Sequence, residues 1–362
     1  MDGAVSKFTM KGSRIVFGFY MATFKSDKPL KTYFKLNWAN REMPETRQAI
    51  GEAKLATLTS AFGEVYNPKD GEESVDLAVL YDISGASKVS TDSGEENFSF
   101  GAITLPQGGV YKKVNSGNME FHKSEIWNTL ANFGLTIKNT EKTPVYYFIM
   151  YNLSFPLQGT FTLETRLKMG KAPIMETAVQ CGPTSIIGSH AGVVVSVKPG
   201  SVPIGLDYKY NGSSVLLQDF TDAHYVQSMT AFALPKSTEV HNFKLDKPFQ
   251  LTTNGEWKSF DLGASLELTK KKTVFFIYNI NLKVDNANFA ARIRIDAKYN
   301  RKSVFTTNGQ NFANAQGYVV KVMKPGKYNF DIDFKSDAKN TFDPSNSELD
   351  GQIVSLQLVL FD

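Results

Sequence analysis

Short segments in which apolar and polar residues alternate dominate this sequence. Alternation with a period of two, in stretches rich in Val, Ile, Phe, Tyr and Thr, is typical of β-strands with one buried face. The alternating segments are 74–83, 145–155, 161–169, 192–197, 273–284, 289–297, 318–323, 328–334 and 352–361. Turn signals such as Asn-Gly and Pro-Gly separate many of them. Many short strands with closely spaced turns predict an all-β protein built as a sandwich or barrel.

Composition excludes several classes of protein. The chain has 362 residues, 42% of them hydrophobic, which is too apolar for a disordered chain. A single Cys excludes an intramolecular disulfide framework, and a net charge of +4 is too weak for a specific grip on nucleic acid. No apolar run approaches the roughly 20 residues that a membrane span requires. We therefore expect a soluble globular protein of two or three domains.

The first residues do not resemble a targeting signal. Lys7, Lys11 and Arg14 precede an apolar patch at 15–24 that is not followed by a small-residue cleavage pattern. We therefore predict no signal peptide, and a location in the cytoplasm or in a virion-type assembly.

One stretch departs from the strand pattern. In residues 44–62, Ile50, Leu58 and Phe62 fall near helical spacing, and Pro44 suits a first helical turn. The pattern predicts one short helix there, although β-branched threonines weaken it. We assign it to an N-terminal extension, residues 1–70, packed on the first domain.

The rest of the chain shows an internal duplication. Each copy has a Trp, an aromatic strand, a strand with an Arg, a Val-rich strand running into Lys-Pro-Gly, and a closing apolar strand. The matched positions are Trp127 and Trp257, Phe161 and Phe289, Arg166 and Arg294, Gly200 and Gly326, and Leu234 and Leu360. This order predicts two antiparallel β-sandwich domains in tandem, at 71–235 and 236–362.

The order of elements resembles the jelly roll of the tumour-necrosis-factor and complement globular-head superfamily. That resemblance implies ten-stranded jelly rolls that associate as trimers through aromatic strand faces. Tandem jelly rolls in one chain also resemble viral double jelly-roll coat proteins, which assemble as trimers.

Consecutive aromatic residues in the two matched strands place bulk on both faces of a sheet. One face fills the core, and the other must be covered by a partner or by another domain. We predict a homo-oligomer interface, with burial between the domains as the alternative. The interface residues are Tyr146, Tyr147, Tyr151, Phe275, Phe276 and Tyr278.

Charged clusters suggest two weaker sites. Asp331 and Asp333 share one strand face and could bind Ca²⁺; otherwise they belong to solvated acidic segments that protect sheet edges. Arg292, Arg294 and Lys298 could contact an anion or an anionic glycan; otherwise they line a polar outer face.

No catalytic pattern stands out. Cys181 lies nine residues before His190, but a thiolate nucleophile needs a lowered pKa and a base within hydrogen-bond reach. We predict no catalytic residues and no cofactor. The predicted function is a non-enzymatic structural protein that self-assembles as a trimer, as a coat or scaffold subunit does. The alternative is a multivalent module that recognises glycans or protein surfaces.

Overall fold

The structure of the protein is a computed structural model. It describes residues 4–84, 89–90, 97–106, 108–115, 118–157, 159, 161–181, 186–217, 225–300, 305–344 and 352–362. Within these ranges the chain is all-β, with antiparallel sheets and only two short 3₁₀ turns, η1 (Lys69–Gly71) and η2 (Met175–Thr177). The strands pair within three successive stretches, which we call module 1 (4–106), module 2 (108–234) and module 3 (235–362).

Module 1 is built on the long hairpin of β2 (Arg14–Trp38) and β3 (Arg41–Tyr66). The hairpin turns at Ala39 and Asn40, which both have positive φ, as a type I′ turn requires. The other strands are β1 (Ala4–Lys11), β4 (Glu72–Ser84), β5 (Val89–Ser90) and β6 (Asn97–Pro106). Successive parts of β2 pair with β6, β5 and β4, and β1 pairs with β4.

The predicted helix at 44–62 is wrong, because these residues lie within β3. Leu58 and Phe62 face the module 1 cluster, whereas Ala61, at an odd spacing from both, faces a different cluster, so side chains alternate between the two faces of a strand. The ladder with β2 supplies backbone hydrogen bonds along the hairpin, and this long-range pairing overrides a weak local helix pattern.

The predicted limit at residue 70 lies inside the module 1 sheet, because β4 and β6 pair with strands that precede it. The predicted limit at 235 and 236 lies between β17 and β18. The division of the chain into independently folding domains stays a prediction.

Module 2 contains two larger sheets and a small one. One sheet has the order β14-β10-β17-β7 and the other has the order β12-β11-β15-β9, with β13 on β11. Its strands are β7 (Val110–Asn115), β8 (Met119–Phe121), β9 (Ser124–Asn139), β10 (Val145–Pro156), β11 (Leu163–Met169), β12 (Ala172–Pro173), β13 (Val179–Cys181), β14 (Ile186–Val197), β15 (Gly200–Tyr210), β16 (Val215–Leu217) and β17 (Val226–Ala233).

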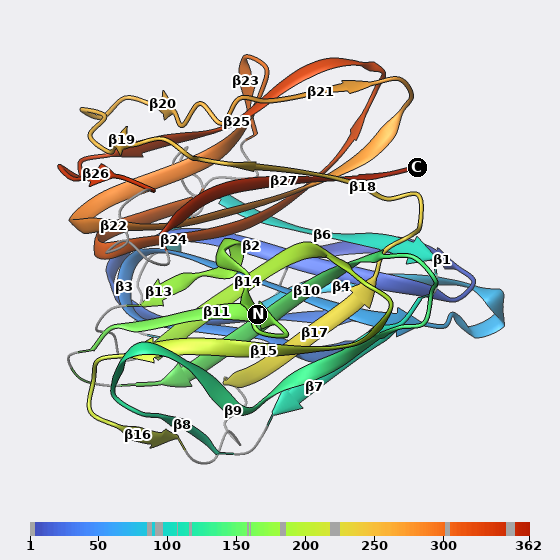
Figure 1. Ribbon diagram of the computed structural model, residues 1–362, viewed down its shortest axis with the longest axis horizontal. Helices are drawn as coiled ribbons and strands as arrows, with labels where there is room; N and C mark the ends of the chain where they lie inside the picture. Colours follow the sequence, from blue (N-terminus) through green and yellow to red (C-terminus); the bar gives the residue numbers. More distant parts are fainter. Residues whose placement is uncertain are drawn as a thin grey trace.

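Module 3 has the sheet order β18-β27-β22-β25-β20, and β21, β23 and β24 join through β25 or β22. Its strands are β18 (Glu239–Lys244), β19 (Phe249–Gln250), β20 (Lys258–Ser259), β21 (Ala264–Leu268), β22 (Lys272–Ile295), β23 (Lys298–Tyr299), β24 (Phe305–Met323), β25 (Gly326–Ser336), β26 (Thr341–Phe342) and β27 (Ile353–Phe361). Figure 1 shows module 3, in orange and red, above the blue strands of module 1 and the green and yellow strands of module 2.

Four hydrophobic clusters hold the chain together. One lies in each module, with Met21 of module 1 joining the cluster of module 3. The fourth cluster contains residues from all three modules and lies where they meet. The modules therefore form one continuous body rather than separate lobes on linkers.

Candidate functional site at the junction of the three modules

Three phenylalanines, one from each module, form the centre of the shared cluster. The ring centroids of Phe17 (β2) and Phe148 (β10) are 4.8 Å apart, and those of Phe17 and Phe275 (β22) are 5.3 Å apart. Phe148 and Phe275 are 6.0 Å apart, which closes a triangle of aromatic contacts. Each separation lies in the range in which aromatic pairs attract one another.

The three phenylalanines occupy equivalent strands. In each module the phenylalanine lies on a strand with a partner on either side. β2 lies between β3 and β6, β10 lies between β14 and β17, and β22 lies between β24 and β27. The cross-strand partners of the phenylalanines, module by module, are Gly63 and Ile103, Val194 and Phe232, and Val320 and Val359. Module 1 thus repeats the arrangement that the sequence had indicated only for the two later parts of the chain.

A tyrosine follows each central phenylalanine by three residues, in the sequences FGFY, FIMY and FFIY. An odd spacing places the two rings on opposite faces of a strand. Accordingly, Tyr20, Tyr151 and Tyr278 are fully buried, the first two within their own module's core. Tyr278 lies in the core of module 3, where its hydroxyl donates to Met21 Sδ at 3.4 Å.

The modules contact one another head to tail. β3 of module 1 packs against β10, β14 and β17 of module 2 and against β24 of module 3. In addition, β14 packs against β22 and β27 of module 3, and β24 packs against β2 and β6 of module 1. Where β14 meets β27, the Gln357 amide exchanges two hydrogen bonds of 2.8 Å with the backbone of Val194. The repeated contact gives the chain an approximate three-fold, ring-like arrangement.

Asn152 on β10 joins modules 1 and 2 through buried hydrogen bonds. Its amide nitrogen donates to the carbonyl oxygen of Glu45 at 2.7 Å, and its amide oxygen accepts from Ser60 Oγ at 2.9 Å. Asn152 is 1% exposed, so these bonds replace solvent contacts that the side chain has lost. They fix the position of β3 on β10.

His190 on β14 links this network to module 3. Its Nδ1 bonds to the carbonyl oxygen of Tyr151 at 3.0 Å and to the amide oxygen of Asn152, so this nitrogen carries the proton. Its Nε2 accepts from the Tyr318 hydroxyl at 2.6 Å. Burial lowers the pKa of His190 to about 3, which keeps the ring neutral.

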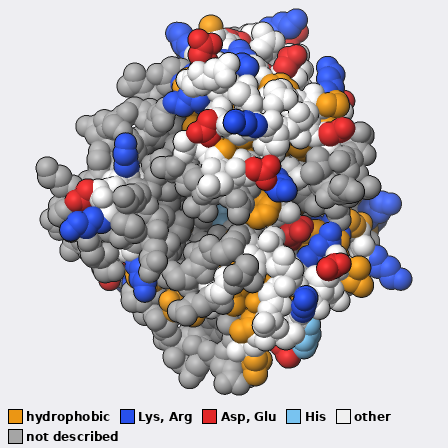
Figure 2. Space-filling model, turned by 90° about the vertical axis from the view of Figure 1, so that its left-hand side faces the viewer, with side chains coloured by type: hydrophobic (Ala, Val, Ile, Leu, Met, Phe, Trp, Pro, Cys, Tyr) orange, Lys and Arg blue, Asp and Glu red, His pale blue; other side chains and the backbone are white. Residues whose placement is uncertain are grey.

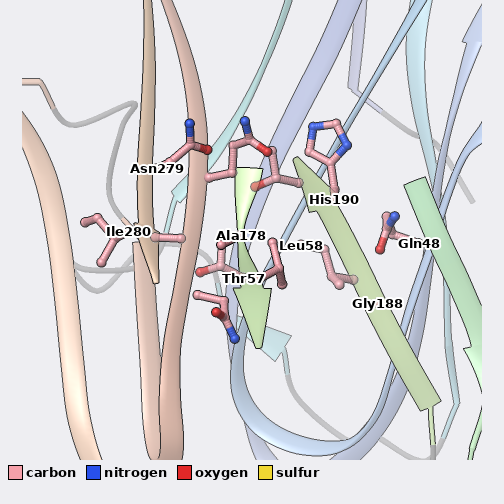
Figure 3. Close-up of a pocket in the computed structure, with 13 residues that line it drawn as sticks. Gln48, Thr57, Leu58, Ala178, Gly188, His190, Asn279 and Ile280 are labelled. Carbon is pink, nitrogen blue, oxygen red and sulfur yellow. The ribbon is translucent and has the colours of Figure 1, made fainter. Parts of the chain in front are cut away.

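A cavity of about 60 Å³ lies beside His190, where module 2 faces module 3. Figure 3 shows His190 and Gly188 on one side of it and Asn279 and Ile280 on the other, with Gln48 and Leu58 contributed by module 1. Asn279 occupies on β22 the place of Asn152 on β10, since each follows the tyrosine of its FxxY segment. The volume suits a few water molecules rather than an organic substrate.

The structure buries the aromatic residues predicted to form an oligomer interface. Tyr147 and Tyr151 lie in the core of module 2, and Phe276 and Tyr278 lie in the core of module 3. Phe275 belongs to the shared cluster, against which the half-buried Tyr146 packs. These residues are not available to a second chain, because the second face of each aromatic strand is covered by another module of the same chain. Phe275 and Tyr146 lie between modules, the place that the alternative of burial between domains gave them, whereas the other four residues lie in the core of their own module.

The predicted anion-contacting arginines form an ion-pair cluster with the predicted calcium ligands. Arg294 Nε bonds to Asp333 Oδ1 at 2.7 Å, and Arg294 Nη2 lies 3.2 Å from Asp331 Oδ2. Asp331 also accepts from the backbone N–H groups of Asp261 and Leu262. Carboxylate oxygens that face N–H donors are poorly placed to ligate a cation.

Arg292, whose Nε lies 3.6 Å from Asp333 Oδ2, also stacks on an indole, at 3.9 Å from the ring centroid of Trp257. Arg166 stacks on Trp127 in the same way at 3.7 Å in module 2. Lys298, on β23, is exposed and lies outside this stack. The stacked cations therefore belong to a structural contact on the outer face of each sheet rather than to an open anion site.

The stacked tryptophans also fix the true register of the two later modules. Residues of one cluster recur 126 positions later in the other: Arg166 and Arg292, Lys168 and Arg294, Asp207 and Asp333, and Lys209 and Lys335. The sequence match of Arg166 with Arg294 is therefore two residues out of register, whereas the matches of Gly200 with Gly326 and of Leu234 with Leu360 have the correct offset of 126. The equal spacing from phenylalanine to arginine in both segments produced that error.

The described residues include the sequence candidates for metal binding and for nucleophilic chemistry. Within them, no group of three or more His, Cys, Asp and Glu side chains is placed to hold a metal ion. Burial raises the pKa of the Cys181 thiol to about 12, the opposite of what a nucleophile requires. His190 bonds to Asn152 and Tyr318 instead of activating the thiol. No helix in the described part of the chain has the length and apolar character of a membrane span.

Comparison with known proteins gives only distant likenesses. No family model and no curated protein matches the chain. Among solved structures, the VP2 subviral particle of infectious bursal disease virus has 8% identity and a TM-score of 0.25, covering 99% of this chain and 80% of that one. Sulfolobus turreted icosahedral virus gives 8% identity and a TM-score of 0.19, with coverage of 99% and 82%. A tandem CBM22 domain of Paenibacillus barcinonensis Xyn10C has 10% identity and a TM-score of 0.21, covering 70% of this chain and 91% of that one.

Two of these three weak neighbours are viral capsid proteins, and none of the three supports the tumour-necrosis-factor resemblance. TM-scores this low do not define a shared fold, so we base no functional conclusion on them.

Proposed function

We propose that this chain is a non-enzymatic structural protein: a preassembled block of three jelly-roll modules that associates with further copies of itself into a coat or scaffold. The observation that supports the proposal is the convergence of Phe17, Phe148 and Phe275 from three equivalent strands. A chain that commits three matched strands to a shared core gives its modules fixed relative positions, as a building block requires.

The energetics favour a rigid block over independently moving modules. Separating the modules would expose the sixteen side chains of the shared cluster, most of which are less than 6% exposed. Each buried Phe, Leu or Ile contributes about 1.5–3 kcal/mol relative to exposure. The ordered positions of Asn152 and His190 add hydrogen bonds that any hinge motion would break. We infer that assembly uses the outer surface, while the junction keeps each block intact.

The trimer predicted from the sequence takes a different form in this proposal. The aromatic strand faces that would join three chains are used to join three modules of one chain. A single chain then occupies the place of a trimer, and homo-oligomers form from such blocks. On the face shown in Figure 2, Lys and Arg side chains are interspersed with Asp and Glu, which suits association through local contacts rather than through one charged patch.

The proposal is tested by measuring mass in solution with light scattering from micromolar to near-millimolar concentration, followed by electron microscopy. We expect compact single chains of 40.2 kDa at low concentration and regular larger particles at high concentration. A strictly monomeric protein over that range would refute self-assembly.

Tyr147→Glu and Phe276→Glu distinguish an intramolecular from an intermolecular aromatic interface. We expect both variants to unfold, because each places a carboxylate in a module core. Folded, dissociated subunits would instead show that the aromatic strands join separate chains.

A further inference from the structure

Modules 2 and 3 have an additional edge strand that module 1 lacks among the described residues. In module 2, β7 pairs with the outer side of β17, and in module 3, β18 pairs with the outer side of β27. The equivalent strand of module 1 is β6, because Ile103 stands opposite Phe17 as Phe232 stands opposite Phe148. Among the residues that the structure describes, β6 pairs with β2 alone.

The equivalence identifies the part of β6 that is left open. β7 covers Gln227–Phe232 of β17, and β18 covers Ser355–Leu360 of β27. Ile103 is equivalent to Phe232 of β17 and to Val359 of β27, because each stands opposite the central phenylalanine of its module. With these residues aligned, the covered stretches correspond to Phe98–Thr104 of β6. An unpaired strand of this length presents a row of backbone N–H and C=O groups that can bind another strand.

The side chains of Phe98–Thr104 carry no charge that would oppose such pairing. β6 has the sequence NFSFGAITLP and contains no charged residue. The edge strands of the other two modules do carry charges: Lys112 and Lys113 on β7, and Glu239 and Lys244 on β18. Charged residues are the usual protection of an exposed edge. In addition, Phe98 and Phe100 pack on the core of module 1 but remain half-buried, and Thr104 is exposed.

We propose that β6 is an assembly edge that pairs antiparallel with β6 of a second copy of this chain. An edge meeting its own copy about a two-fold axis forms an antiparallel pair, so one strand serves as both donor and acceptor of the contact. The absence of charge on β6 means that the two copies do not repel, and the paired strand covers Phe98 and Phe100. This inference rests on the proposed self-assembly and gives that assembly a specific site.

The test combines a charge variant with hydrogen exchange. Thr104→Lys places like charges on the two facing edges at an exposed position, so the isolated fold is retained and the dissociation constant should rise at least tenfold. Val114→Lys is the matched control: Val114 is 46% exposed on the charged edge strand β7, and the same change there should leave association unchanged. The backbone amides of residues 97–105 that do not bond to β2 should exchange more slowly as the protein concentration rises.

Three results would overturn the inference. Association unchanged by Thr104→Lys, with amide exchange in 97–105 independent of concentration, would place the contact elsewhere and leave the proposed self-assembly standing. Full protection of these amides at the lowest concentration would show that the chain covers its own edge. No association at any concentration would refute the proposed function and this inference together.

Discussion

The central phenylalanine triangle predicts a measurable coupling between modules. Replacing Phe17 or Phe148 by Leu keeps apolar bulk but removes a ring from a pair whose centroids are 4.8 Å apart. Each single change should lower the free energy of unfolding by about 1.5 kcal/mol, since the volume is nearly conserved. The double variant should lose less than the sum, because the ring–ring attraction of about 0.5–1.5 kcal/mol is lost only once.

The assay is urea unfolding followed by intrinsic fluorescence. Trp38, Trp127 and Trp257 report modules 1, 2 and 3 respectively, since each module contains one of the three tryptophans of the chain. Phe121→Leu is the matched control, because Phe121 is fully buried in the module 2 core and belongs to a cluster separate from Phe17. Phe121→Leu and Phe17→Leu should add to within about 0.5 kcal/mol.

Additive effects of Phe17→Leu and Phe148→Leu would refute the reasoning, because they would show that the rings of modules 1 and 2 do not stabilise each other. A shift of the transition for Phe148→Leu at Trp127 alone would refute it as well. It would mean that the modules unfold independently of their junction.

Three further predictions concern single side chains. Asn152→Ala should cost about 2–3 kcal/mol by removing the acceptor of the Ser60 hydroxyl and one donor to the Glu45 carbonyl, whereas Asn279→Ala beside the cavity should cost about 1 kcal/mol or less; denaturant unfolding of the two compares them directly. Trp257→Ala should cost about 1–2 kcal/mol through loss of the Arg292 stack, and an unchanged unfolding midpoint would show that the stack contributes nothing. Because the pKa of His190 is lowered to about 3 in the folded state, its contribution to stability is fully present above pH 6.5 and falls as the pH drops towards 3. The loss should be at most about 1.4 kcal/mol per pH unit, and His190→Gln should show a shallower decline between pH 6 and 4.

The all-β class could be read from the sequence because period two is a local property of each strand. The junction could not be read in the same way, because a strand such as β10 has two apolar faces and its own residues do not specify what covers the second. Tyr147 and Phe148 are adjacent and equally aromatic, yet one lies in a module core and the other in the shared cluster. Which face meets which neighbour depends on chain topology, which the alternation does not contain.

The sequence nevertheless contained a signal that module 1 repeats the other two modules. The segments FGFY, FIMY and FFIY share a phenylalanine and tyrosine three residues apart, and AITLP at 102–106 resembles AFALP at 231–235. A helical interpretation of 44–62 concealed it, since it separated β2 from its pairing partner and reduced the first 70 residues to an extension. The turn at Ala39 and Asn40 lacks the Gly that usually marks a type I′ hairpin, so the hairpin itself gave little warning.

The three modules are more alike in the strands that meet at their junction than in their outer strands. At the centre, the FxxY strands leave little freedom, because each Phe must meet two others while each Tyr fills a core on the opposite face. At the rim no such constraint acts, and the modules differ: two carry a stacked tryptophan and a charged outer strand, and the first has the uncharged β6. If assembly required three equivalent contacts, the rims would need to match. A block with a common centre and one distinctive edge is instead suited to pairwise, directional association, which is why we assign the contact between copies to β6.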